Sequence, residues 1–304
     1  MLRIVLWGLL VALTGCAAGG PSRIEVQLER SNPEPLLRYY FGAYAAPETA
    51  DPFEAGLLVN EGDRYWLNTE GSPHAEALTA ATGPDGVLTW DELKAFVGET
   101  YYDARRLPPT LDALYATLPQ DSSAWFAIEV KGVMTVAQRR IQVPEASLRY
   151  ALENYQANDQ QLLYPIGTAF VATHTLEGDV VETTLMQKRA DGLWDFATYD
   201  ANGLLAPSTT TEPKALSTPT QCVGCHSGNR AFEPEKSFPE PARDGPHGPR
   251  GIFVPDAWRD PALVAYFDEH RKRSDTVLGI YNTLFVAKLR ASGEDPDLLT
   301  AVGL

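Results

Sequence analysis

The stretch Cys222-Val223-Gly224-Cys225-His226 constrains this 304-residue chain more than any other feature. Two thiols three positions apart, followed at once by an imidazole, bring three metal- or cofactor-binding groups into one short segment. The chain has three cysteines in all, and the third, Cys16, stands near the amino end. No second C-x-x-C pair exists in the sequence, so the motif cannot be one half of a four-ligand zinc site.

A redox dithiol and a covalently held haem remain as uses of the motif. A thioredoxin-like dithiol opens a helix after a strand and does not require histidine after its second cysteine. C-x-x-C-H is the attachment signal of c-type haem: each thiol adds to a vinyl group, and the histidine becomes the proximal iron ligand. We therefore expect one covalent haem c, held by Cys222 and Cys225 with His226 on the iron. A chance occurrence or a disulfide is the alternative.

The first twenty residues predict an exported chain. Arg3 gives a basic start, and residues 4–13 form an apolar run that is too short to span a bilayer. The following Leu13-Thr14-Gly15-Cys16 resembles the lipobox of bacterial lipoproteins, whose cysteine is acylated and becomes the mature amino terminus. We expect removal of residues 1–15 and a lipid anchor on Cys16, with ordinary secretory cleavage as the alternative. Because Ala17 rather than Asp follows the cysteine, the resemblance implies the periplasmic side of an outer membrane.

The composition is acidic, with 25 Lys and Arg against 40 Asp and Glu and a formal net charge of −15. Removal of residues 1–15, which contain a single charged residue, Arg3, would make this −16. An acidic surface argues against nucleic acid as a partner and against direct docking on anionic lipid. It suits a basic redox partner protein, although such charge also serves simply to keep an exported protein soluble.

The patterning predicts an α+β fold with three parts after the leader. Residues 16–118 are expected to be mixed but mostly helical. Residues 119–235 are expected to form an antiparallel β-sheet haem domain with packed helices. Residues 236–304 are expected to be a carboxy-terminal extension with two helices, one beginning at Asp260-Pro261 and one running from Ser274 to Gly293.

The sheet is predicted from three strand-like runs, 168–176, 180–189 and 193–199. Glu177-Gly178-Asp179 and Ala190-Asp191-Gly192 separate them, and both are hairpin signals, so the runs predict an antiparallel meander. Upstream of the meander an amphipathic helix is predicted. Its apolar residues stand at the spacing i, i+3, i+4 and i+7, and they are Leu148, Ala151, Leu152 and Tyr155.

A loop near residue 85 has part of the pattern of a calcium-binding EF-hand. Gly86 and Glu92 stand at its sixth and twelfth positions, but Ala81 and Gly83 at the first and third offer no side-chain oxygen. We therefore favour a helix–turn–helix without calcium, built on Pro84-Asp85-Gly86, with Thr89 capping the second helix.

A meander followed by a late C-x-x-C-H resembles the cytochrome P-460 family and its β-sheet cytochrome c′ relatives. The resemblance covers about residues 120–230 and rests on the segments VPEASLRYALENY, YPIGTAFVATHT, TLMQKRADGLWDFATYDANG and CVGCHS. It implies a five-stranded antiparallel sheet with haem c beside it and His226 as the proximal ligand. It also implies a pocket on the other haem face for a small nitrogen or oxygen ligand, such as NO or CO.

One position departs from the hydroxylamine-oxidising members of that family. In those enzymes a strand lysine is bonded to the haem edge, and the resemblance places it at residue 172, which is alanine here. This favours the relatives without that bond, which bind gases. The nearest rival lysine is Lys188 on the next predicted strand. The hairpin turn at 177–179 pairs residue 176 with residue 180, and continuing the count opposes Lys188 to Thr168, well away from residue 172.

Because side chains alternate along a strand, Phe170, Ala172 and His174 share a face and are candidates for the distal pocket. His174 could act as an acid–base group or a sixth iron ligand, but we favour a surface histidine near the end of the hairpin.

Three functions are therefore candidates for this chain. The first is a lipid-anchored c-type cytochrome that binds a small ligand or transfers electrons. The second is a haem enzyme that oxidises hydroxylamine or reduces peroxide or NO, for which the catalytic residues are unknown apart from His174. The third is a scaffold in which the haem only holds the fold together for a partner protein.

Overall fold

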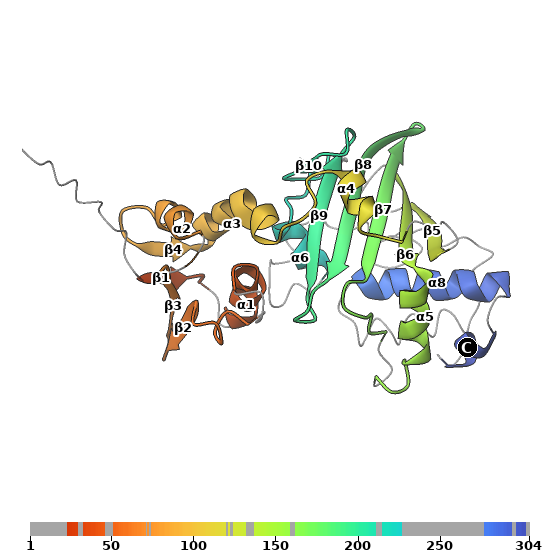
Figure 1. Cartoon of the computed structure of the whole chain (residues 1–304), viewed down its shortest axis with the longest axis horizontal. Helices are drawn as coiled ribbons and strands as arrows, with labels where there is room; N and C mark the ends of the chain where they lie inside the picture. The colour runs from red at the N-terminus through yellow and green to blue at the C-terminus, as the bar shows by residue number, and fades with distance from the viewer. Residues whose placement is uncertain are drawn as a thin grey trace, which may run out of the picture.

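The computed structural model describes the greater part of the chain between residues 23 and 301. The described residues are 23–29, 33–45, 51–70, 72, 74–119, 121, 124–131, 137–158, 162–210, 215–226, 277–293 and 296–301. The predicted leader, Cys16 and the helix expected from Asp260 lie outside the described residues. None of the described helices is long and apolar enough to cross a membrane. The fold is α+β, with two sheets in which antiparallel pairing dominates (Figure 1).

The amino-terminal part contains a four-stranded sheet in addition to its helices. Its strand order is β2 (Leu58–Glu61), β3 (Arg64–Asn68), β1 (Arg23–Gln27) and β4 (Val87–Thr89), with only β1 and β4 parallel. The helices are α1 (Glu34–Gly42), α2 (Ala75–Ala81), α3 (Trp90–Ala104) and α4 (Leu111–Ala116). Among the described residues of this region more are helical than in strands, but the sequence analysis placed none of the strands. In β1 the apolar residues Ile24 and Val26 are buried and alternate with more exposed residues. This alternation in the sequence could have predicted the strand.

The predicted turn and cap before α3 are confirmed. The Thr89 hydroxyl accepts a hydrogen bond from the Glu92 backbone N–H, and the Glu92 carboxylate accepts one from the Thr89 backbone N–H at 2.8 Å. This reciprocal capping box satisfies two helix-end donors. The carboxylate of Asp85 accepts from the backbone N–H of Val87, and Gly86 has a φ of +69°, which favours glycine. Asp85 therefore stabilises the turn and Glu92 stabilises the start of the helix.

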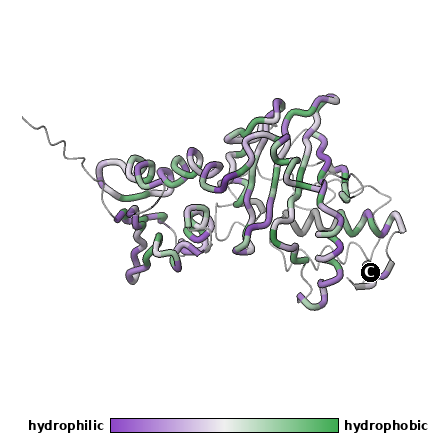
Figure 2. Tube along the Cα trace, in the orientation of Figure 1, coloured by the Kyte–Doolittle hydropathy of each residue, from purple (hydrophilic) through white to green (hydrophobic). Residues whose placement is uncertain are grey.

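The larger sheet is an antiparallel meander of six strands, in which every neighbour in space is also the neighbour in sequence. The strands are β5 (Trp125–Lys131), β6 (Gln138–Pro144), β7 (Ala169–Leu176), β8 (Asp179–Lys188), β9 (Trp194–Asp200) and β10 (Leu205–Ala206). The three predicted strand runs correspond to β7, β8 and β9. A bulge between His174 and Thr175 shifts the register near the hairpin turn, where Figure 2 shows hydrophilic residues.

Helices cover both faces of this sheet. On one face, the N–H of Leu111 in α4 donates to Gly203, and Tyr115 in the same helix is hydrogen-bonded to Thr173 in β7. On the other face lies α8 (Val277–Ser292), whose Phe285 packs its ring against Phe126 and Phe170 (Figure 1). The sheet is therefore the middle layer of a helix–sheet–helix arrangement.

Two further helices complete the packing around the sheet. In α5 (Glu145–Glu153) the predicted apolar residues Leu148, Ala151 and Leu152 are buried, and Tyr155 is buried just beyond the end of the helix. The short helix α9 (Pro296–Ala301), which the sequence analysis did not predict, contacts both α5 and α8. The predicted end of α8 at Gly293 is confirmed, because that glycine follows the last helical residue with a φ of +70°.

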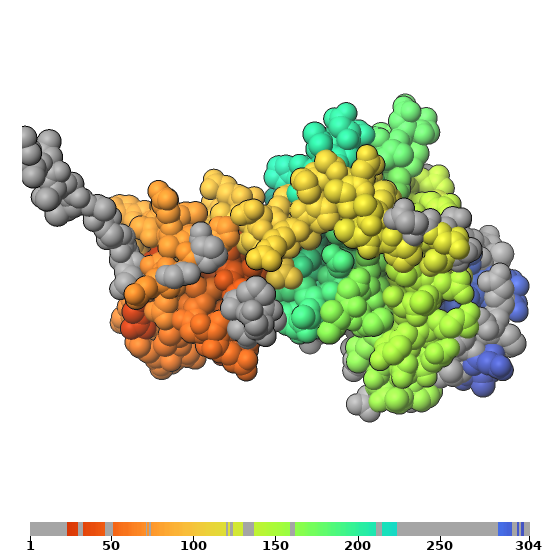
Figure 3. All heavy atoms as spheres, in the orientation of Figure 1, coloured from red at the N-terminus to blue at the C-terminus, as the bar shows by residue number. Residues whose placement is uncertain are grey.

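The amino-terminal part joins the meander along the outer edge of β9. The hydroxyl of Tyr39 in α1 donates to the backbone oxygen of Trp194 at 3.0 Å. The hydroxyls of Tyr101 and Tyr102 in α3 accept from the N–H groups of Phe196 and Thr198. The short β10 pairs with β9 only at Thr198 and Tyr199. The hydroxyls of Tyr39, Tyr101 and Tyr102 therefore bond to backbone groups at the edge of β9 that would otherwise be open. Figure 3 shows the α3–α4 segment, in yellow, running from the amino-terminal part across the sheet.

Candidate haem-attachment site

The C-x-x-C-H motif lies in helix α6 (Thr220–His226), which follows the meander directly. The helix begins with the N–H of Gln221 donating to Ser217 and the N–H of Val223 donating to Pro219. In a helix, residues three apart lie on one face, so the backbone places the positions of Cys222 and Cys225 side by side. The side chains of Cys225 and His226 lie outside the part that the structure describes. The helical backbone suits the attachment of both thiols to one planar group.

Cys222 is a half-buried thiol in α6. Its sulfur lies 3.8 Å from the hydroxyl of Thr218, and the Thr218 hydroxyl is in turn 2.8 Å from the hydroxyl of Thr198 in β9. The neighbouring Val223 is fully buried. A thiol that packs against the core but remains partly accessible fits the requirement for thioether formation with a haem.

The contact between Thr218 and Thr198 identifies the face of the sheet on which α6 lies. In the strand register Ala172, Thr184 and Thr198 stand directly opposite one another on β7, β8 and β9, so their side chains share one face. Phe170 and His174, two residues to either side of Ala172, lie on that face as well. All three predicted pocket residues therefore project from the face of the sheet against which the motif helix packs.

Phe170 is surrounded by aromatic rings on this face. It is 4% exposed, and its ring centroid lies 4.9 Å from that of Tyr164, 5.6 Å from that of Trp194 and 6.0 Å from that of Phe285. These contacts come from the loop before β7, from β9 and from α8. This end of the face is therefore apolar.

The favoured interpretation of His174 as a surface histidine is wrong. The side chain is 6% exposed and its two ring nitrogens have fixed neighbours: Nε2 is 3.2 Å from the Thr184 hydroxyl, and Nδ1 is 3.2 Å from a carboxylate oxygen of Glu182. Burial, assisted by the positive charge of Arg139 on the next strand, lowers the pKa of His174 from 6.5 to about 3. The imidazole is therefore neutral at physiological pH. The position near the hairpin turn misled because Glu182 and Thr184 on the neighbouring strand β8 pack against the ring.

Glu182 is a buried acidic residue that the sequence analysis did not single out. Its side chain is fully buried, and its second carboxylate oxygen accepts hydrogen bonds from the N–H and the hydroxyl of Thr210, at 2.5 and 3.0 Å. Thr210 belongs to the segment that leads from β10 toward α6. The sequence could have indicated this residue, because the residue count along the predicted hairpin places position 182 opposite position 174, as the structure does. Glu182 thereby ties the approach to the motif helix to the same face of the sheet.

Lys188 was the nearest lysine that could replace the absent one at position 172. The prediction that it opposes Thr168 is confirmed, since the backbone N–H of Lys188 donates to Thr168 and its backbone oxygen accepts from Gly167. Its ammonium group lies 4.9 Å from the centre of the Trp194 ring, and burial lowers its pKa. Lys188 is therefore four positions away from Ala172 along the strand and packed against another residue.

Among the side chains that the structure describes, no group of three or more His, Cys, Asp and Glu is arranged to hold a metal ion. No protein-family model matches the chain. Neither a curated protein nor a solved structure is significantly similar to it.

We predict that His174 makes the stability of the protein fall as the pH falls from 7 to 5. The unfolded histidine takes up a proton near pH 6.5, whereas the folded one does so only near pH 3, so protonation favours the unfolded state throughout that interval. The loss from this one group is about 2 kcal/mol between pH 7 and pH 5. Urea unfolding of the wild type and of His174→Gln at both pH values measures it. The same pH dependence in both proteins would contradict the assignment.

Proposed function

We propose that this protein is a lipid-anchored, periplasmic c-type cytochrome with one covalent haem that binds a small ligand such as NO or CO, or transfers electrons. The observation that carries the proposal is the C-x-x-C-H motif on α6, packed against the sheet face that bears Phe170, Ala172 and His174. Cys222 and Cys225 would hold the haem and His226 would be its proximal ligand. The resemblance to the cytochrome P-460 family is part of the proposal, and the antiparallel meander before the motif supports it.

When bound, haem c supplies an iron that can bind a diatomic molecule or change its oxidation state. The chain's own residues determine which of these reactions is accessible. Phe170 and its aromatic neighbours exclude water from one part of the face. The methyl group of Ala172 packs against the core and offers no group that could bond to a porphyrin. Both features suit the binding of a small, weakly polar ligand.

Enzymatic turnover is the second candidate, and the surroundings of His174 argue against it. An acid–base group needs a ring nitrogen that can exchange a proton with the ligand. Both ring nitrogens of His174 lie 3.2 Å from other side chains, those of Glu182 and Thr184. This favours binding or electron transfer over the oxidation of hydroxylamine or the reduction of peroxide or NO.

We expect the haem to be covalent. Because thioether bonds survive denaturation, the colour of the protein should persist through acid–acetone extraction. The double variant Cys222→Ala, Cys225→Ala should lose it, while His226→Ala should keep the covalent bonds and lose the proximal ligand. Absorbance of the extracted protein and intact mass measure this, with Cys16→Ser as a matched cysteine control that keeps its haem. Free extraction of haem from the wild type would exclude the proposal.

We expect an ordinary haem c spectrum, because Ala172 cannot form the lysine bond that disturbs the conjugation of the macrocycle. The mass should equal that of the apoprotein plus one haem with two thioethers, and hydroxylamine should be oxidised little or not at all. Adding CO to the reduced protein distinguishes the two branches of the proposal: a shifted Soret band indicates an open iron site, and an unshifted one indicates a six-coordinate electron carrier. A peptide map that links any lysine to the porphyrin would restore the enzyme candidate.

The anchor is tested separately from the haem. If Cys16 is acylated, the wild type should sediment with the membrane fraction of the host, and Cys16→Ser should move to the soluble periplasmic fraction. Incorporation of radiolabelled palmitate into the wild type alone would support the same conclusion. Wild-type protein recovered wholly in the soluble fraction would show that the leader is an ordinary secretory peptide.

A further inference from the structure

The four-stranded sheet of the amino-terminal part has one buried face and one exposed face. The buried face is formed by apolar side chains that are at most 1% exposed, namely Ile24, Leu58, Leu67 and Leu88. Because side chains alternate along a strand, the residues between these point to the opposite face. The strand register places one half-buried residue of each strand in a row across that exposed face: Val59, Trp66, Glu25 and Val87.

Trp66 is the largest side chain of the exposed face. Its indole N–H is enclosed and has no hydrogen-bond partner among the described residues, so any exposed part of the ring is carbon. Val59 stands directly beside it on β2, and Val87 stands on the far side of Glu25 on β4. The centre of the exposed face is therefore apolar except for one glutamate.

The charged side chains around this row are paired with one another. The guanidinium carbon of Arg23 lies 5.0 Å from the centre of the Trp66 ring, and its Nη2 lies 2.8 Å from a carboxylate oxygen of Glu61. The Nε of Arg64 lies 3.8 Å from a carboxylate oxygen of Glu25. These four charges cancel, although the chain as a whole has a formal charge of −15. Exposed pairs of this kind contribute little, so both arginines can turn to another partner.

The exposed face begins where the chain leaves its predicted anchor. Six uncharged residues, AAGGPS, separate Cys16 from Arg23, which is the first residue of β1. Even when fully extended, this link spans no more than about 25 Å. An acylated Cys16 would therefore keep the small sheet close to the bilayer. The side chain of Arg23, at the end of the link, already belongs to the exposed face.

We propose that the exposed face docks on the surface of the membrane that holds Cys16, with Trp66 at the level of the lipid head groups. The proposal rests on the lipid anchor argued above. Tryptophan is enriched at the boundary between membrane and water. Arginine there lays its hydrocarbon stem along apolar surface and keeps its charged end among polar groups. Since the four charges of the face cancel, it suits zwitterionic lipid, and docking fixes how the attached meander and motif helix stand on the membrane.

The test uses the acylated protein, purified from the membranes of its host and reconstituted into vesicles of phosphatidylcholine with plain or brominated acyl chains. Bromine quenches tryptophan fluorescence only at close range, and the ratio of the two intensities cancels any quenching within the protein. We expect quenching in the wild type and its loss in Trp66→Phe. It should persist in Trp125→Phe, a matched control that replaces another half-buried strand tryptophan, in β5 of the meander.

A second pair of variants keeps Trp66 in place. Val59→Glu puts a charge beside Trp66 and should weaken the quenching, because the charge would have to enter the head-group region. Val180→Glu puts the same charge at an exposed valine of the β7–β8 hairpin and should leave the quenching unchanged. Thermal unfolding by circular dichroism shows whether each variant is folded.

Mass spectrometry of the amino-terminal peptide first shows whether Cys16 carries acyl chains. If it does, and brominated lipid quenches the wild type and Trp66→Phe equally or not at all, the inference is wrong and the anchor stands. A Trp66 signal that changes with the density of protein in the vesicles, and not with bromine, would assign the face to a second copy of the chain and also exclude docking on lipid. If Cys16 carries no acyl chain, the anchor and the inference are both wrong.

Discussion

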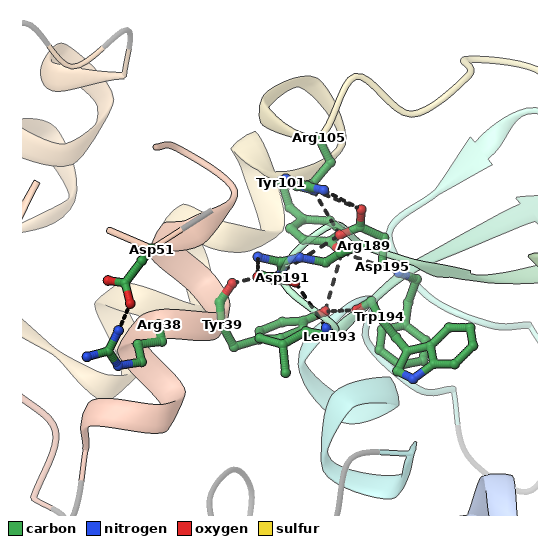
Figure 4. Close-up of polar contacts among 11 residues, drawn as sticks. Arg38, Tyr39, Asp51, Tyr101, Arg105, Arg189, Asp191, Leu193, Trp194 and Asp195 are labelled. Carbon is green, nitrogen blue, oxygen red and sulfur yellow. Dashed lines mark hydrogen bonds and ion pairs between the residues drawn. The ribbon is translucent and has the colours of Figure 1, made fainter. Parts of the chain in front are cut away.

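The buried carboxylate of Asp195 is the interaction on which the assembly of the two sheets depends. It stands at the outer edge of β9 and accepts hydrogen bonds from Tyr101 and Arg105, both in or directly after α3 (Figure 4). Arg189 lies on its other side, 3.8 Å away, and donates to the backbone oxygen of Tyr39 in α1. A charge buried this deeply is tolerated only when its partners are present, and losing one of them costs about 3–5 kcal/mol. The position of the amino-terminal helices is therefore fixed by the requirement to satisfy one residue of the larger sheet.

The same junction solves the problem of the open sheet edge. An unpaired strand exposes N–H and carbonyl groups that would pair with another chain. The two residues of β10 cannot cover β9, and tyrosine hydroxyls provide the remaining partners through groups that both donate and accept. A tyrosine side chain is long enough for its hydroxyl to reach the backbone of β9 from a neighbouring helix. The helices α1 and α3 can therefore cover an edge that would otherwise need another strand. The motif helix α6 packs beside these tyrosines and so depends on the same contacts.

The face of the sheet beneath α6 combines an apolar end and a polar end. Phe170 and its aromatic neighbours form the first, and His174, Glu182 and Thr184 form the second. Glu182 and Thr184 lie 3.2 Å from the two ring nitrogens of His174, and Glu182 also holds the segment before α6 through Thr210. Their arrangement helps to position the motif helix.

The sequence by itself determined the features that depend on neighbours along the chain. These include the strands β7 to β9, the apolar residues of α5, the cap at Thr89 and the end of α8 at Gly293, because alternation, helical periodicity and capping are local patterns. The attachment motif is likewise a local signal, and it predicts the haem ligands Cys222, Cys225 and His226 without reference to a fold. The count from the hairpin turn placed Lys188 opposite Thr168 correctly, but it paired residue 176 with residue 180, whereas Leu176 pairs with Asp179 and the bulge after His174 shifts the register.

Only the tertiary structure decided what depends on distant segments. The sheet of β1 to β4 was missed because its strands are three to five residues long and two of its pairings, β1 with β3 and β1 with β4, join residues far apart in sequence. His174 packs against Glu182 and Thr184 one strand away, and Glu182 is in turn bonded to Thr210, which lies 36 residues after His174 in the sequence. The partners of Asp195 lie about ninety residues upstream in α3. Whether a polar side chain is exposed or enclosed is a property of the layers that pack around it, and no local pattern encodes those layers.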